Sequence, residues 1–374
     1  MKITSRCLGF FVYCLLAIPS AVPQTPNQKF LAFVGTYTDK TDSKGIYAYE
    51  FDAATGKLTP KGLAAETSNP SWLVIHPNGK WAYAANESGQ QSTISAFSID
   101  AKSAKLTLLN QLPAAGEDPC YLSLDKAGKF LFAANYTSGN VVVFPILTDG
   151  KLGEHTADVK DVGTLGPNKE RQEAPHAHWV EGSDYFVWIT DLGLDRILIY
   201  KFDPATGSIA LPESPFVGRK SEGPYFIPLH PGTGPRHVTG HGRFTYVLGE
   251  LHSTVTVFYL DNLKRNTEIQ RVSTLPEGFT GRNDAAEIVI YPSGKWLFAS
   301  NRGHDSIAVF AIDPPTGKLK PAGDYPTGRF LLAENQNSNS IVVFRIDPPT
   351  GALSQVSITE GVPSPVCLTF LRTR

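Results

Sequence analysis

The chain has few cysteines, no run of charge of one sign, and none of the short motifs that mark the commonest enzyme classes. Its 34 basic and 35 acidic side chains give a formal net charge of -1. A protein that wraps nucleic acid needs a basic excess to neutralise phosphates, so we expect no nucleic-acid partner. The sequence has no G-x-S-x-G, H-E-x-x-H, phosphate-binding glycine loop or Cys-x-x-Cys. We therefore expect neither a cofactor nor a metal ion.

The first 26 residues differ in composition from the rest. Lys2 and Arg6 precede an apolar run from Cys7 to Ile18, and small and polar residues follow, with a cleavage zone near Ala21. This order is typical of an export signal, and the run is too short to span a bilayer. We expect 1–26 to be a signal and disordered N-terminus, no stable membrane span, and a periplasmic or secreted protein. If the segment is not a signal, the protein is cytoplasmic.

Two of the four cysteines fall within that segment. The other two, Cys120 and Cys367, occupy equivalent places in the stretches PCYLSL and PVCLTF. We expect buried thiols that behave as small apolar side chains rather than a disulfide.

One apolar strand is repeated along the whole chain. Its copies are LAFVGTY, KWAYAANE, KFLFAANY, YFVWITD, RFTYVLGE, KWLFASNR and RFLLAENQ. In the last six copies the final position is polar and its residue type varies: Glu87, Tyr136, Asp191, Glu250, Arg302 and Gln336. A scaffold needs only the apolar strand to recur. A polar position whose residue type varies between repeats indicates a site assembled from several repeats.

Each repeat predicts a four-stranded antiparallel sheet. Turns such as HPNGK join its first and second strands, and turns such as IDPPTGKL join its third and fourth. The second strand near the N-terminus has no first strand before it, whereas PSPVCLTFL at the far end has no partner. We therefore predict an all-β, seven-bladed β-propeller forming a single domain over 27–374, in which the C-terminal strand completes the N-terminal blade.

The last blade is predicted to be short. The step from Asn301 to Asn335 is the shortest between successive repeats, and the missing part falls between Tyr325 and Thr327. We expect the seventh blade to lack its innermost strand.

The starts of first strands and the ends of second strands are expected to meet at one rim of a propeller. The polar residues gathered there are His176, His178, Arg236, His237, Glu250, Arg302, Glu87 and Asp191. Acids, bases and guanidinium groups that converge on one opening are a candidate site.

Each of these residues also has a structural interpretation. His176 and His178 alternate along a strand, so only one should face the opening, and a packed core histidine is the simpler reading. Arg236 could brace a carboxylate such as Glu250. Asp191 is equally well explained as a turn-forming residue.

The chain resembles the seven-bladed-propeller lactonase family, whose named activity is 6-phosphogluconolactonase. The stretches that carry the resemblance are NPSWLVIHPNGKWAYAANE, PHAHWV with TDLGLDRILIY, GPRHV with VLGELHSTV, and SNRGHDSIAVFAID with PTGKL. Fungal carboxymuconate cycloisomerases are distant relatives with the same fold. The roles proposed in them imply catalytic residues at His176, Arg236, Glu250 and Arg302. The chain departs from the family in its seventh blade, where DYPTGRF replaces an arginine-bearing first strand, and in the fifth, where GHGRF replaces the usual turn.

The resemblance implies hydrolysis of a sugar-type lactone. We expect the protein to be a monomer. Glu250 or His176 would be the general base, while Arg236 and Arg302 would hold the oxyanion or an anionic substrate group. Further substrate contacts are predicted for His178, His237, Glu87, Asp191, Tyr136 and Gln336. An export signal favours a lactone without phosphate. The alternatives are an exported, non-enzymatic binding propeller and a muconate-type cycloisomerase.

Overall fold

The structure is a computed structural model, and it describes residues 11–12, 29–211, 225–261, 265–291, 293–321, 330–346 and 353–372. In these ranges the regular structure is β-strand, apart from one 3-10 turn at Gly89–Gln91. None of the helical structure there is long and apolar enough to cross a membrane.

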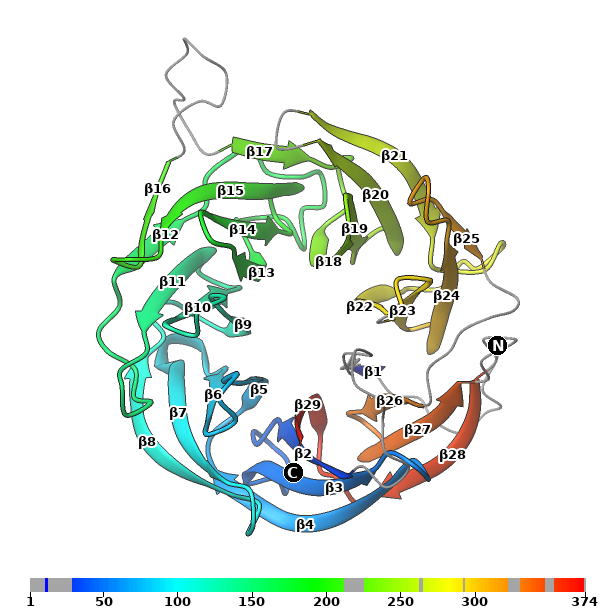
Figure 1. Ribbon diagram of the computed structural model, residues 1–374. Helices are drawn as coiled ribbons and strands as arrows, with labels where there is room; N and C mark the ends of the chain where they lie inside the picture. The colour runs from blue at the N-terminus through cyan, green and yellow to red at the C-terminus, as the bar shows by residue number, and fades with distance from the viewer. Residues whose placement is uncertain are drawn as a thin grey trace. The chain divides into compact units, whose positions relative to one another are not determined.

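Seven antiparallel sheets make up the fold (Figure 1), and they confirm the predicted all-β class of a seven-bladed β-propeller. The first blade consists, in pairing order, of β29 (Pro365–Arg372), β2 (Lys29–Thr36), β3 (Gly45–Asp52) and β4 (Lys57–Glu66). The second consists of β5 (Pro70–Ile75), β6 (Trp81–Asn86), β7 (Thr93–Asp100) and β8 (Lys105–Pro113). The third consists of β9 (Pro119–Leu124), β10 (Phe130–Asn135), β11 (Asn140–Pro145) and β12 (Ala157–Lys160).

The fourth blade has one strand more than predicted, because β16 and β17 both pair with β15. The fourth blade consists of β13 (Ala177–Gly182), β14 (Phe186–Asp191), β15 (Arg196–Asp203), β16 (Ser208–Ala210) and β17 (Tyr225–Pro228). The fifth consists of β18 (Pro235–His241), β19 (Phe244–Gly249), β20 (Thr254–Asp261) and β21 (Arg265–Ser273). The sixth blade consists of β22 (Asp284–Ile290), β23 (Trp296–Arg302), β24 (Ser306–Ile312) and β25 (Leu319–Pro321). The seventh consists of β1 (Phe11–Val12), β26 (Phe330–Asn335), β27 (Ser340–Ile346) and β28 (Leu353–Glu360).

The C-terminal strand completes the first blade, as predicted. β29 pairs with β2 in a register that runs from Phe30 opposite Arg372 to Thr36 opposite Pro365. Apolar packing reinforces this ladder, since the Phe370 ring contacts those of Phe30 and Phe51. Strands distant in sequence are thereby joined by both backbone bonds and a buried aromatic cluster.

The seventh blade has an unexpected partner for its second strand. β1 pairs with β26, with Phe11 opposite Asn335 and Val12 opposite Glu334. β1 lies within the segment predicted to be an export signal. The place where the first strand was predicted to be missing, between Tyr325 and Thr327, lies outside the described residues.

The chain divides into two compact units. One contains the residues up to Ala64 together with those from His237 onward, and the other runs from Ala65 to Arg236. Within each unit, neighbouring blades pack through similar buried tyrosines of second strands. The Tyr83 hydroxyl donates to the Gly150 carbonyl in one unit, and the Tyr246 hydroxyl donates to the Gly317 carbonyl in the other. Each buried tyrosine hydroxyl thus has a hydrogen-bond acceptor at the contact between blades.

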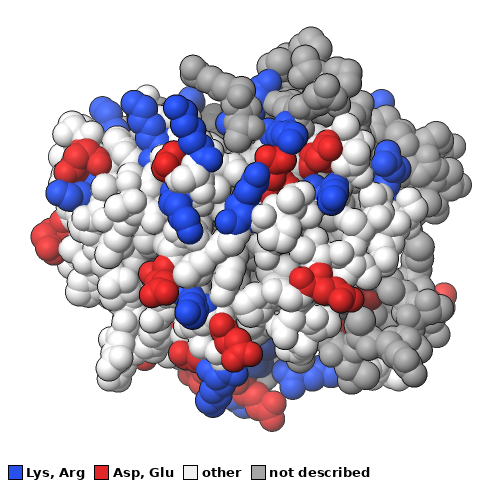
Figure 2. Space-filling model, turned by 90° about the horizontal axis from the view of Figure 1, so that it is seen from below, with Lys and Arg blue, Asp and Glu red and all other residues white. Residues whose placement is uncertain are grey.

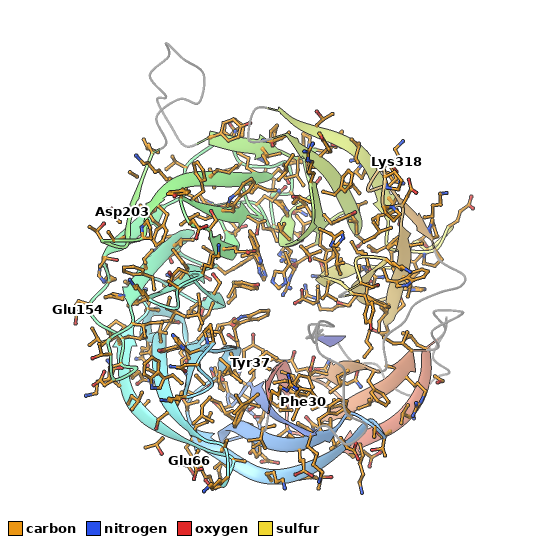
Figure 3. The ribbon with its side chains drawn as sticks, viewed as in Figure 1. Phe30, Tyr37, Glu66, Glu154, Asp203 and Lys318 are labelled. Atoms are coloured by element: carbon orange, nitrogen blue, oxygen red, sulfur yellow. The ribbon has the colours of Figure 1, made fainter. Side chains whose placement is uncertain are left out.

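A recurrent backbone device sets the start of the first strands. Asn69, Asp118, Gly234 and Ser364 all have positive φ and all precede a proline. In three blades the carbonyl of this residue accepts the N–H of the residue that follows a second strand, namely Glu87, Tyr136 and Tyr37. Figure 3 shows Tyr37 at the inner side of its blade, whereas Asp203, in a turn between outer strands, lies at the outer side. The predicted meeting of strand starts and strand ends is therefore confirmed in these blades.

Most inner strands also carry a β-bulge near their start. The pairing of β5, β9, β13, β22 and β29 with their second strands shifts register there. Bulges bend a strand and redirect side chains, so simple alternation fails at these positions.

Charged side chains are mixed in sign on the face shown in Figure 2, where lysine and arginine lie among aspartate and glutamate. Cys120 and Cys367 form no disulfide in the described part of the chain. Cys367 is buried, as predicted, whereas Cys120 is half-buried rather than buried.

Candidate functional site

An ion pair joins the ends of the second strands of the fifth and sixth blades. Glu250 follows β19 and Arg302 ends β23, and a guanidinium nitrogen of Arg302 lies 3.0 Å from Oε1 of Glu250. The Glu250 side chain is only 3% exposed, whereas that of Arg302 is 19% exposed. Arg302 Nε also donates to the Asp284 carbonyl at 3.3 Å. The carboxylate therefore anchors a guanidinium group that still reaches solvent.

A histidine–carboxylate pair joins the first strands of the same two blades. Nδ1 of His237, in β18, lies 3.1 Å from Oε2 of Glu287, in β22. Their side chains are 3% and 12% exposed. The other oxygen of Glu287 accepts the N–H of Ile288 at 2.9 Å, so the two oxygens have different partners. Glu287 lies in the bulge of β22, which explains how it leaves the regular alternation.

Buried amides hold the loops around these pairs. The Asn283 side chain donates to the Ser253 hydroxyl and to the Asn301 side-chain oxygen, and the Asn301 side chain in turn donates to the Thr274 carbonyl. The Glu250 carbonyl accepts the Ala285 N–H at 3.1 Å. Rigid backbone support of this kind keeps functional side chains in a fixed geometry.

Tyr136 and two histidines form an aromatic cluster in the other unit. The His176 ring stacks on Tyr136 with centroids 4.4 Å apart and an interplanar angle of 11°, and the His178 ring meets Tyr136 edge-on at 5.5 Å. The bulge at the start of β13 lies at His178. Both rings contact one side chain, as residues two apart on a strand can because they share a face, so the expectation that the two rings point to different sides is wrong.

Both ring nitrogens of His176 face acceptors. Nδ1 lies 2.9 Å from the Tyr136 carbonyl, and Nε2 lies 3.1 Å from Oε1 of Glu173. A neutral imidazole has one N–H and cannot donate to both. One of the two ring nitrogens therefore donates to its acceptor in the neutral ring, and the tautomer decides which.

Three buried polar side chains, those of Asp191, Asp161 and Tyr200, lie near His176. Oδ1 of Asp191 accepts the N–H groups of His176 and Leu194, at 3.0 and 2.9 Å. The Tyr200 hydroxyl donates to Oδ1 of Asp161 at 3.3 Å. Burial, followed by the charge of Asp191, holds the pKa of Asp161 well above its usual range. Burial raises the pKa of Asp191 to about 6.

The remaining predicted site residues have varied environments. Glu87, Gln336 and Arg236 are half-buried, and Asp191 has no exposed surface. The Arg236 carbonyl accepts the Thr190 hydroxyl at 2.6 Å. The structure thus brings Glu250 together with Arg302 in one unit, and Tyr136 with His176 and His178 in the other.

Sequence reasoning did not single out Glu287, Asp161 or Glu173. Glu287 interrupts an otherwise apolar stretch, AAEIVI, and that interruption was the available signal. Asp161 lies in a polar segment where nothing marks it. Among the described residues, no three or more His, Cys, Asp or Glu side chains are grouped so that they could hold a metal ion.

Comparison with known proteins gives a consistent result. The family described as "Lactonase, 7-bladed beta-propeller" matches residues 31–370. The chain is 36% identical over 296 residues to a 6-phosphogluconolactonase of Bacillus subtilis, covering 78% of this chain and 80% of the relative. It is 33% identical to a 6-phosphogluconolactonase of Formosa agariphila, covering 78% and 81%. Among solved structures, a periplasmic gluconolactonase of Pseudomonas aeruginosa has a TM-score of 0.82 and 31% identity, covering 92% of this chain and 99% of that one.

Proposed function

Because the chain belongs to the seven-bladed β-propeller lactonase family, we propose that it hydrolyses the intramolecular ester of a sugar lactone. The observation that carries this proposal is the Glu250–Arg302 pair, which presents a partly exposed guanidinium group on a buried carboxylate. Ester opening places negative charge on the carbonyl oxygen, and a preorganised guanidinium group stabilises that charge in the transition state.

The substrate class is proposed from two supports. The N-terminal segment has the composition of an export signal, and a structural neighbour is named as a periplasmic gluconolactonase. Both favour a lactone without phosphate, such as δ-gluconolactone, in a periplasmic or secreted setting. The 6-phosphogluconolactonase relatives make the phosphorylated lactone the comparison substrate.

Incubation of the purified protein with δ-gluconolactone and with its 6-phosphate, corrected for spontaneous opening, tests the proposal. We expect enzymatic opening of at least the unphosphorylated lactone. Single alanine replacements of His176, Glu250 and Arg302 should then lower the rate. Unchanged rates in all three would contradict the proposed site, and a muconate lactone assay in the same series separates hydrolysis from cycloisomerisation.

A further inference from the structure

A groove of about 410 Å³ lies on the fourth blade. Three segments form it, namely the loop before β13, the turn between β14 and β15, and the stretch from β17 to β18. Its lining is mostly apolar and includes Leu165, Leu194, Phe226 and Leu229. Leu165 is 41% exposed and Phe226 is 39% exposed, so the groove opens to solvent. None of the candidate site residues described above lines it.

The groove exists because the outer strand of this blade is split. β17 pairs with the first half of β15, with Pro228 opposite Arg196 and Phe226 opposite Leu198, and β16 pairs with the second half (Figure 1). The two oxygens of Asp195 accept the N–H groups of Gly232 and Gly234, at 2.6 and 2.8 Å. These bonds tie the turn after β14 to the stretch after β17. The walls of the groove are therefore held in place by the backbone, as in a preformed binding site.

The charged residues of the lining give the groove a positive character. They are Lys169, Arg196 and Asp195. The Asp195 carboxylate is buried, and both its oxygens already accept backbone N–H groups. A molecule in the groove would therefore meet the charges of the two basic side chains more strongly than that of the acid.

Arg196 is prepared for an anion. Its guanidinium carbon lies 4.2 Å from the centroid of the Phe226 ring, and the side chain is half-buried. In the part of the chain that the structure describes, Arg196 has this ring contact but no hydrogen bond and no ion pair. A guanidinium group stacked on a ring keeps the N–H donors of its edge, which match the two oxygens of an acid group.

We propose that this groove binds a small organic anion with an apolar body. The ring or chain of the anion packs on Phe226 and Leu229, its acid group pairs with Arg196, and Lys169 adds a second positive charge. The volume is that of a site for a small molecule rather than for a folded domain. A sugar lactone does not fit this description, because apolar walls would leave its hydroxyl groups without partners. The proposal is therefore independent of the proposed lactonase function.

Fluorescence titration of the full-length protein with two related probes tests the proposal. Anilinonaphthalene sulfonate is an aromatic anion, and N-phenylnaphthylamine has the same rings without the sulfonate. We expect Arg196→Met to weaken binding of the sulfonate about tenfold. Lys169→Met, at an exposed position, should weaken it about threefold. Both variants should leave the affinity for the neutral probe unchanged.

Two further variants locate the binding. Phe226→Ala removes the ring under Arg196 and should weaken both probes. Lys201→Met is the matched control, because it removes an exposed positive charge from the same strand, β15, outside the groove. We expect this control to bind both probes as the wild type does.

The outcomes that would overturn the proposal are distinct. One is the absence of sulfonate binding to the wild type, and another is equal affinity in the wild type and Arg196→Met. If Arg196→Met does not fold, Lys169→Met takes its place, and equal affinity has the same meaning. Light scattering of the same samples tests a different occupant. A dimer that Phe226→Ala abolishes would assign the groove to a second copy of the chain instead. No lactone is used, so failure of the proposed function leaves these results unaffected.

Discussion

Oε1 of Glu250 lies 3.0 Å from a guanidinium nitrogen of Arg302, and this contact ties the end of β19 to the end of β23. One partner is almost fully buried and the other partly exposed. Removal of the cation leaves a buried carboxylate without this compensation, whereas removal of both charges does not. The pair is therefore expected to contribute to both stability and catalysis, and the two contributions can be measured separately.

Arg302→Ala should lower the free energy of unfolding by about 3 kcal/mol, because it leaves Glu250 buried without its guanidinium partner. The double variant Glu250→Gln with Arg302→Met should recover part of that loss. Urea unfolding of the single and double variants measures the coupling. If the change in unfolding free energy of the double variant equalled the sum of the changes in the single variants, the two side chains would not interact energetically.

Asp161→Asn should stabilise the protein at pH 7 and flatten its stability profile. The pKa values of Asp161 and Asp191 are both raised by burial, so the folded state holds protons that the unfolded chain releases. Their contribution is greatest below the ordinary carboxyl pKa of about 4, and it is lost as the pH rises through the raised values. Asparagine can donate to Asp191 and accept from Tyr200 without a titrating proton.

Denaturant midpoints of Asp161→Asn and wild type between about pH 4 and 8 check this prediction. Asp125→Asn is the control, because its expected effect on the stability of the protein is opposite to that of Asp161→Asn. The oxygens of Asp125 accept the N–H groups of Ala127, Lys129 and Phe130. Its amide variant should destabilise the protein at neutral pH. If the stability of Asp161→Asn fell more steeply with rising pH than that of wild type, the raised pKa of Asp161 would be contradicted.

Tyr136→Leu should reduce kcat/KM for the lactone about fivefold, because aromatic stacking on His176 is worth roughly 1 kcal/mol. Tyr136→Phe keeps the ring and removes the hydroxyl, which accepts a hydrogen bond from Arg171 at 3.3 Å. We expect it to retain most of the activity. Steady-state rates of both variants decide whether the ring of Tyr136 matters, and wild-type activity in the leucine variant would remove this cluster from the site.

Removal of residues 1–28 should lower the melting temperature by only a few degrees, about 1 kcal/mol in stability. Among the described residues, β1 forms two residue pairs with the seventh blade, whereas β29 is paired with β2 over its whole length. Deletion of 364–374 should instead prevent cooperative unfolding. Thermal melts of the two truncated proteins test the comparison. A larger loss from the N-terminal deletion would show that β1 is an integral strand.

Much of the fold could be predicted from the sequence because its signals are local. Repeated apolar strands and glycine turns gave every second strand, and the unpaired stretch PSPVCLTFL gave the closing of the first blade. The bulges were missed because they depend on the pairing of two strands. The reading of His176 and His178 was wrong because residues two apart on a strand share a face, and both rings contact Tyr136. The partner of His237 was missed for a reason similar to that of the bulges. Glu287 is distant in sequence, and only packing of β18 and β22 brings the two side chains together.

The pairing of β29 with β2 also orders events during synthesis. Phe30 emerges from the ribosome long before Arg372, its partner in the finished sheet. Blades whose strands are contiguous can form as they appear, but the first blade must wait for the last strand. Until translation is nearly over, the nascent chain presents an open edge at β2 and an unsealed aromatic cluster around Phe51. We therefore expect a chaperone that binds extended apolar segments to act on the N-terminal part of this chain, and to do so late in translation.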